Sequence, residues 1–152
     1  MARQKDFDQE KALRKAVRLF SQQGFAATST DELMRAMEVG RQSMYDTFGD
    51  KRALFLKALE VYVSKNVRAI NVELRAPGSP LAAIRSALVH FSERKDLSST
   101  DGCMGINEDV TRITHRAACA QRHTLMDTLR RAQKEGELDA RTDTESLARW
   151  QE

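Results

Sequence analysis

The sequence predicts an all-α protein, and three observations lead to that fold class. Gly (7) and Pro (2) are scarce among the 152 residues, whereas good helix formers such as Ala, Leu, Arg, Glu and Gln are abundant. Apolar residues recur at helical spacing along almost the whole chain, and strand-like alternation is absent from the sequence. With 41% hydrophobic and 31% charged residues, the composition is that of a folded globular protein.

Composition also bounds where the protein works. The sequence has no apolar run of about 18 residues and starts with charged rather than apolar residues, so neither a membrane span nor secretion is expected. Two cysteines, Cys103 and Cys119, do not make a disulfide framework and fit a cytoplasmic location. The net charge of +3 is carried entirely by residues 1–57, which hold 11 Lys and Arg against 8 Asp and Glu. Such a bias is a weak pointer to nucleic acid, and on charge alone an ordinary solvated surface is the better explanation.

The first helix is expected to run from about Asp8 to Gln23. Asp8 is a suitable N-cap residue, and Gly24 is suited to end the helix because glycine readily adopts the left-handed backbone found there. One apolar stripe predicts the buried face, and it consists of Ala12, Leu13, Ala16, Val17 and Phe20.

Two short helices are predicted next. Residues 28–32 hold two overlapping capping patterns, Thr28 with Asp31 and Ser29 with Glu32. The first short helix ends near residues 38–40, and the second runs from about Arg41 to Phe48. The inward residues of the first are expected to be Leu33, Met34, Ala36 and Met37.

Longer helices follow. Asp50 caps a helix from 51 to about 75, and the Pro-Gly-Ser-Pro segment 77–80 is the clearest linker-like stretch. A loop is expected at 98–102, a short helix from Cys103 to about Ile113, a long helix over about 115–135 closed by Gly136, and a last helix from 143 or 144. The amphipathic helix between the linker and the loop has its apolar stripe at Leu81, Ile84, Leu88 and Phe91.

The two short helices, joined by the turn at 38–40, form a candidate helix-turn-helix. In such a motif the second helix enters the DNA major groove, so its outer face needs hydrogen-bonding groups and its inner face needs core residues. The inner face is predicted to carry Met44 and Phe48. On the outer face, an arginine can hydrogen-bond a guanine and a glutamine can hydrogen-bond an adenine. The outward side chains are Arg41, Gln42, Ser43, Tyr45, Asp46 and Thr47. By pattern alone, an ordinary helical bundle with a polar surface remains an alternative.

Two stretches carry a more specific motif: Phe25-x-x-Thr28-Ser29-Thr30-Asp31-Glu32-Leu33 and the run from Val39 to Phe55. Within the second, Tyr45, Phe48 and Lys51 form an aromatic–x–x–aromatic–x–x–Lys pattern. Over about residues 7–58 the sequence resembles the N-terminal domain of TetR/AcrR-type transcriptional repressors. The segments 102–107 and 136–138 look more weakly like parts of that family's regulatory domain.

The resemblance implies an all-α homodimer with a helix-turn-helix DNA-binding domain at 1–50 and a helical ligand-binding and dimerisation domain at 51–152. It implies a ligand-responsive repressor that binds a palindromic, double-stranded DNA operator and a small-molecule effector, without a cofactor or an enzymatic activity. Arg41 and Gln42 match base-reading positions of the family. The full set of implied DNA-binding residues is Thr28, Thr30, Arg41, Gln42, Ser43, Tyr45, Thr47 and Lys51. Candidates for effector contacts, which are more often ordinary core residues, are Tyr62, Phe91 and Met104.

The sequence also departs from the family pattern. Gly40 stands where a Ser or Thr cap is usual, and Asp46 stands where an aromatic residue or His is common. A carboxylate at that place either accepts from a cytosine amino group or orients Arg41. Family members are typically longer, so we expect the chain to be C-terminally short and to lack the usual last helices. That puts the homodimer in doubt and leaves an alternative, a truncated helical protein or interaction module that does not bind operator DNA.

A metal-responsive sensor is a further alternative. His115, Cys119 and His123 recur at helical spacing, and imidazole and thiolate are good ligands for zinc, copper or nickel. The same spacing is also that of surface residues at the rim of a helix whose core face is marked by Leu125 and Leu129. We therefore expect no metal site, with these three residues as the candidates should one exist.

Overall fold

The computed structural model describes residues 8–93 and 108–149, and their regular structure is entirely helical. The predicted all-α class is thereby confirmed for this part of the chain. The described residues divide into two compact units, unit 1 with residues 8–62 and 108–111, and unit 2 with residues 63–93 and 112–149. The division after Tyr62 falls inside a helix, whereas the domain boundary expected at residue 50 lies at that helix's start.

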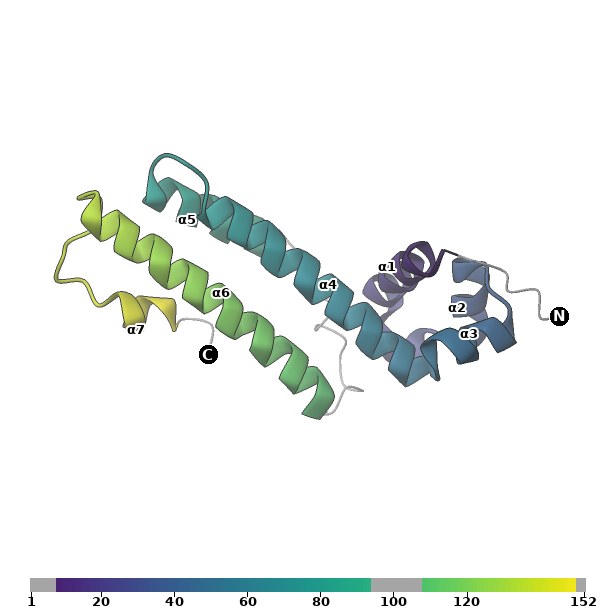
Figure 1. Ribbon diagram of the computed structural model, residues 1–152. Coiled ribbons are helices and arrows are strands. Elements are labelled where there is room, and N and C mark those ends of the chain that lie inside the picture. The colour runs from purple at the N-terminus through teal and green to yellow at the C-terminus, as the bar shows by residue number, and fades with distance from the viewer. Residues whose placement is uncertain (1–7, 94–107, 150–152) are drawn as a thin grey trace. The chain divides into compact units, whose positions relative to one another are not determined.

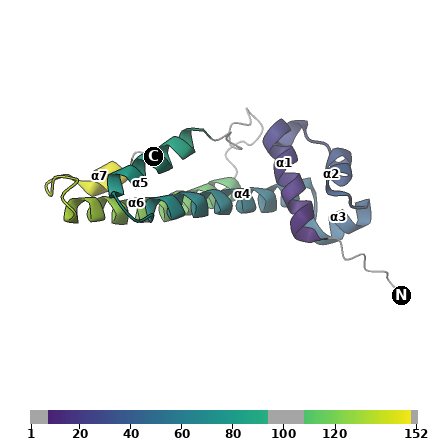
Figure 2. The same ribbon diagram turned by 90° about the horizontal axis from the view of Figure 1, so that it is seen from above.

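Unit 1 contains α1 (Gln9–Ala27), α2 (Thr30–Met37), α3 (Arg41–Phe48) and the first turns of α4 (Lys51–Leu74) (Figure 1). Figure 2 shows α1 beside α2 and α3. The Asp8 carboxylate caps α1 by accepting a hydrogen bond from the Lys11 N–H at 3.0 Å, as the sequence predicts. At Gly24 the backbone leaves the helical region, with φ 79° and ψ 172°, so the predicted end of the first regular helix is confirmed. The Asp50 carboxylate accepts from the Ala53 N–H at 2.7 Å at the start of α4.

An aromatic cluster forms the centre of unit 1. Phe20 of α1 is 1% exposed, and its ring meets that of Phe55 of α4 edge to face with centroids 5.1 Å apart. Phe25 packs against both rings, with centroid distances of 6.3 Å to Phe20 and 5.2 Å to Phe55. Around this cluster lie further buried side chains, namely Ala12, Ala16, Leu33, Met37, Met44, Phe48 and Leu54.

The start of α2 is fixed by a complete capping box. The Ser29 hydroxyl accepts from the Glu32 N–H, and the Glu32 carboxylate accepts from the Ser29 N–H at 2.8 Å. The bond from the Ser29 N–H and a second bond of 2.7 Å, which the Ser29 hydroxyl donates to the same carboxylate, lower the pKa of the Glu32 carboxyl below its ordinary value of 4.5. Of the two overlapping capping patterns in the sequence, the Ser29 pattern is the one that forms.

We expect Ser29→Ala to lower the free energy of unfolding by about 1 kcal/mol, because the α2 N–H loses its acceptor. Urea unfolding followed by circular dichroism measures this loss. Ser21→Ala is the matched control, since the Ser21 hydroxyl only bonds back to the Val17 carbonyl inside α1. Equal effects of the two substitutions would contradict a capping role for Ser29.

Unit 2 contains the second half of α4, α5 (Pro80–Ser92), α6 (Glu108–Lys134) from residue 112 onward, and α7 (Thr144–Ala148). Its core joins α4, α5 and α6 and consists of Ile70, Leu74 and Ala87, with Ile84 and Leu125 packed against them. On α5 the fully buried residues are Pro80, Ala83 and Ala87. The larger apolar residues of that helix, Leu81, Leu88 and Phe91, stay 38–43% exposed.

The linker-like segment 77–80 is a tight turn inside unit 2. Ser79 caps α5, and the Glu137 carboxylate accepts from the Ser79 hydroxyl at 2.8 Å and from the Leu81 N–H at 3.0 Å. Gly136, with φ 79°, follows α6 and confirms the predicted helix end. The Asp143 carboxylate caps α7 by accepting from the N–H groups of residues 145 and 146.

One predicted boundary is wrong. The sequence predicts a short helix ending near Ile113 and a separate long helix starting near His115, whereas α6 is continuous from Glu108 to Lys134. No glycine or proline interrupts this stretch, and β-branched residues alone do not break a helix. The expected start at Cys103 lies outside the described residues. Among the described helices, none combines the length and the apolar character needed to cross a membrane.

Candidate nucleic-acid interface

The turn between α2 and α3 is short and well defined. Glu38 ends α2 in the left-handed conformation, with φ 60° and ψ 40°, and the Val39 N–H donates to the Met34 carbonyl at 3.1 Å. The Glu38 carboxylate accepts from the Lys15 ammonium, which lowers the pKa of Glu38. This ion pair ties the turn to α1. Gly40 precedes α3 without a side-chain cap, as its lack of a hydroxyl requires.

The inner face of α3 is as the sequence predicts. Met44 is 0% exposed and Phe48 is 4% exposed, so both side chains anchor the helix in the core of unit 1. The outer face carries Arg41, Gln42 and Asp46 as exposed residues and Tyr45 with 42% exposure. A short helix is thus held by two apolar side chains while its polar side chains face outward.

Each of the two predicted base-reading side chains contacts a carboxylate. Arg41 Nη2 lies 3.0 Å from Asp31 Oδ1 of α2, and Gln42 Nε2 donates to Asp46 Oδ1 at 2.8 Å. The alternative in which Asp46 orients Arg41 is therefore not what the structure has, because Asp31 takes that place. Sequence reasoning missed Asp31, since a contact between residues ten positions apart across a turn leaves no periodic signal.

The hydroxyl residues differ in accessibility. Thr28 is 1% exposed, and its hydroxyl donates to the Gly24 carbonyl at 2.5 Å, so it closes the junction between α1 and α2 instead of facing outward. Thr30, Ser43 and Thr47 are half-buried at the surface of α2 and α3.

Lys51 lies at the N-terminus of α4 and is half-buried. Its ammonium sits 4.4 Å from the centroid of the Phe25 ring, a cation–π contact that fixes the charge near the end of α3. The Lys57 ammonium of α4 also contacts the end of α3, because it donates a hydrogen bond to the Thr47 carbonyl at 3.1 Å. Lys57 is not among the residues that the sequence predicts for the interface.

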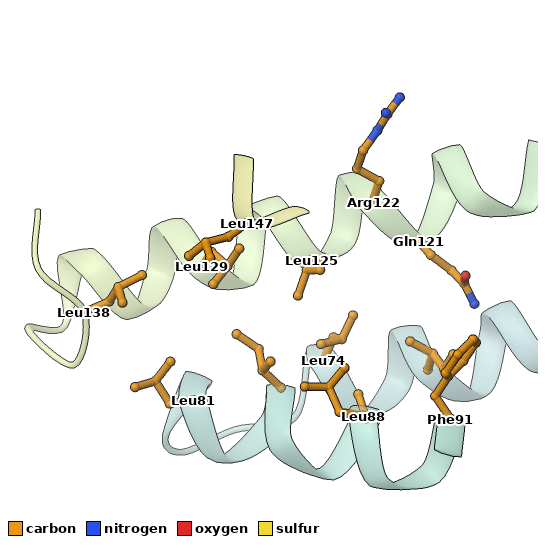
Figure 3. A pocket seen from close by; sticks show the side chains of 13 residues that line it. Leu74, Leu81, Leu88, Phe91, Gln121, Arg122, Leu125, Leu129, Leu138 and Leu147 are labelled. Atoms are coloured by element: carbon orange, nitrogen blue, oxygen red, sulfur yellow. The ribbon is translucent and has the colours of Figure 1, made fainter. Parts of the chain in front are cut away.

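The effector candidates fall in different places. A cavity of about 550 Å³ lies within unit 2, and Phe91 lines it whereas Tyr62 is not among its lining residues. Met104 lies outside the described residues. Figure 3 shows apolar side chains of α4, α5 and α6 converging on the cavity, with Gln121 pointing inward and Arg122 pointing away. The remaining lining residues are Ile70, Leu74, Leu81, Ile84, Ala87, Leu88, Leu125, Leu129, Leu138 and Leu147.

The three metal candidates lie along α6, where Cys119 contacts His115 and His123 contacts Asp127. Cys119 Sγ is 3.8 Å from His115 Nδ1, while His123 Nε2 is 3.6 Å from Asp127 Oδ2. Within residues 8–93 and 108–149, no three side chains of His, Cys, Asp or Glu come together in a way that could hold a metal ion.

Comparison with known proteins agrees with this arrangement. A family model described as bacterial regulatory proteins, tetR family, matches residues 12–58. The uncharacterized HTH-type transcriptional regulator YezE of Bacillus subtilis (strain 168) is 35% identical over 161 residues, covering 99% of this chain and 83% of YezE. The HTH-type transcriptional repressor ComR of Escherichia coli (strain K12) is 29% identical over 161 residues, covering 97% of this chain and 76% of ComR.

A solved structure of similar fold was determined with DNA. It is a cysteine mutant of the TetR family transcriptional regulator CifR complexed with 26-base-pair double-strand operator DNA, with 28% sequence identity and a TM-score of 0.70. The alignment covers 96% of this chain and 82% of that one. Family model, relatives and fold agree, and the chain belongs to the TetR family of bacterial transcriptional regulators.

Proposed function

We propose that this regulator is a ligand-responsive repressor that reads a palindromic operator through α3. The observation that carries the proposal is the two-sided character of α3: Met44 and Phe48 are buried, while Arg41, Gln42 and Tyr45 are exposed. An α-helix with its side chains is about 10–12 Å in diameter, which fits the width of a major groove. Arg41 is assigned to a guanine and Gln42 to an adenine.

Phosphate contacts are proposed for the side chains that surround these readers. Hydroxyls and a fixed ammonium set the register of a helix on the DNA backbone without reading sequence. The proposed residues are Thr30, Ser43, Tyr45, Thr47 and Lys51. Thr28 is left out because its hydroxyl is buried and bonded to Gly24. The CifR complex with operator DNA and the repressor ComR, both similar to this chain, support operator binding in general.

The proposed operator has two half-sites about one helical turn apart, each read by α3 of one copy in a homodimer. The proposed effector is a small molecule bound in the cavity of unit 2, whose size of about 550 Å³ suits such a ligand. An effector that binds one conformation better than the other shifts the population toward it and so changes operator affinity.

Selection from a pool of random-sequence DNA duplexes tests the proposal without a known operator. The purified chain is expected to enrich a two-fold symmetric motif over successive rounds. Recovery of duplexes with no shared motif, at the level of a protein-free control, would overturn the proposed function.

We expect Lys51→Ala to weaken binding to the enriched duplex and to a scrambled duplex by the same factor. The loss of one phosphate contact should also reduce the slope of log affinity against log salt by about 1. Fluorescence anisotropy titrations across a salt series measure both quantities.

Lys134→Ala serves as the control for Lys51→Ala, because it removes an exposed lysine at the end of α6 in unit 2. Thermal unfolding is measured alongside, since Lys51→Ala also removes the contact with the Phe25 ring. A salt slope that is the same in wild type and Lys51→Ala would exclude the proposed phosphate contact.

A further inference from the structure

Within the described residues, the Asp31 side chain of α2 reaches Arg41, one of the two predicted base-reading residues of α3, across a distance of 3.0 Å. We propose that Asp31 determines the sequence specificity of DNA binding by holding the Arg41 guanidinium in place for a guanine edge and away from phosphate. This inference rests on the proposed function of α3.

The carboxylate of Asp31 is well placed for this role. The capping box of Ser29 and Glu32 fixes the first turn of α2, and Asp31 lies inside that turn. Its negative charge there interacts favourably with the positive end of the α2 helix dipole. Arg41 is the first residue of α3, so the ion pair spans the turn between the two helices.

The Asp31–Arg41 ion pair is weak compared with a specific contact to a base. Both side chains are about two-thirds exposed, 64% for Arg41 and 67% for Asp31. An exposed pair of this kind shifts an equilibrium constant up to about fivefold, whereas a two-bond contact with guanine discriminates by about 5- to 150-fold. Asp31 occupies one of the five guanidinium N–H donors of Arg41, so the other donors can reach a guanine while the ion pair persists.

The Asp31 carboxylate also weakens DNA binding that involves no base recognition. A guanidinium free of Asp31 would be available to any phosphate, and phosphate contacts raise affinity for all sequences alike. With Asp31 present, Arg41 is partly neutralised and the negative charge repels the DNA backbone. Asp31 thus lowers affinity for non-cognate DNA more than affinity for the operator.

The Gln42–Asp46 pair differs from the Asp31–Arg41 pair, and the difference supports the assignment of specificity to Asp31. Their hydrogen bond of 2.8 Å lies within α3, one turn apart, and joins a neutral amide to the carboxylate. That pair moves with the helix and involves no cation that phosphate could capture. The specificity effect is therefore assigned to Asp31 and Arg41.

The test is selection from the random duplex pool with wild type, Asp31→Asn, Arg41→Ala and the double variant. Asp31→Asn is expected to weaken the base preference at one base pair of the motif. This is the same base pair at which Arg41→Ala abolishes the preference. The ratio of affinities for enriched and scrambled duplexes should fall about two- to fivefold, mainly because binding to the scrambled duplex tightens. In the Arg41→Ala background, Asp31→Asn should leave the base preferences unchanged.

Two controls separate this role from others. Glu10→Gln removes a carboxylate from another exposed ion pair of unit 1, that with Arg14, and should leave the base preferences unchanged. Thermal unfolding of Asp31→Asn reports its effect on α2, and a purely structural role would lower the melting temperature without changing the preference at one base pair.

Unchanged base preferences in Asp31→Asn, with a motif enriched by wild type, overturn this inference alone. The same relaxation in the Arg41→Ala background overturns it as well, because Asp31 would then act without Arg41. A wild-type chain that enriches no motif overturns the proposed function and this inference with it.

Discussion

Arg41→Ala is expected to lower affinity for the enriched operator about 5- to 150-fold, which corresponds to about 1–3 kcal/mol. The exposed guanidinium at the start of α3 is the side chain best able to form two hydrogen bonds with one guanine. Its loss should also relax the preference at one base pair in each half-site. Anisotropy titrations with the enriched duplex and with single-base variants measure both effects.

Arg141→Ala is the matched control for the loss of one positive charge. Arg141 forms an exposed ion pair of 3.0 Å with Asp139, the same type and length as that of Arg41, but in unit 2. It should change affinity for every duplex alike and only slightly. If Arg41→Ala keeps both wild-type affinity and wild-type base preferences, then the start of α3 does not read bases.

Phe20→Ala is expected to have the largest effect on stability, about 3–5 kcal/mol in the free energy of unfolding. Phe20 is 1% exposed and contacts the rings of both Phe25 and Phe55, so alanine would leave a cavity where α1 meets α4. Because the core of unit 1 also anchors α3, operator binding should be lost at temperatures where wild type still binds. Urea unfolding and anisotropy measure the two losses.

Phe91→Ala provides the control for the aromatic substitution. Phe91 is 43% exposed in unit 2, so its removal takes away much less buried surface. We expect its effect on unfolding to be well below that of Phe20→Ala. A loss of less than about 1 kcal/mol for Phe20→Ala would contradict the central place of the aromatic cluster in unit 1.

Helix ends were the part of the fold that the sequence predicted best. Asp8, Ser29 and Asp50 cap helices as expected, and Gly24 and Gly136 end them with positive φ. Caps and left-handed glycines depend on neighbouring residues, so their signals are complete within a few positions. The continuity of α6 was missed because β-branched residues near Ile113 lower the helix propensity locally without breaking a helix, and no glycine or proline lies between residues 108 and 134.

The candidate site was predictable in part. The apolar spacing of Met44 and Phe48 fixed which side of α3 faces outward, and the burial of both residues confirms it. The burial of Thr28 and the contact between Asp31 and Arg41 depend on how α1, α2 and α3 pack, which residue spacing does not encode. The DNA contacts of the individual residues stay predictions.

Footprinting of the purified chain on the most strongly enriched duplex, across a salt series, tests the central claim most directly. The account predicts a protected site with two-fold symmetry, half-sites about one helical turn apart, and protection that falls steeply as salt rises. Arg41→Ala should lose this protection at salt concentrations where wild type keeps it. Protection that is uniform along the duplex, or that is identical in wild type and Arg41→Ala, would contradict operator reading by α3.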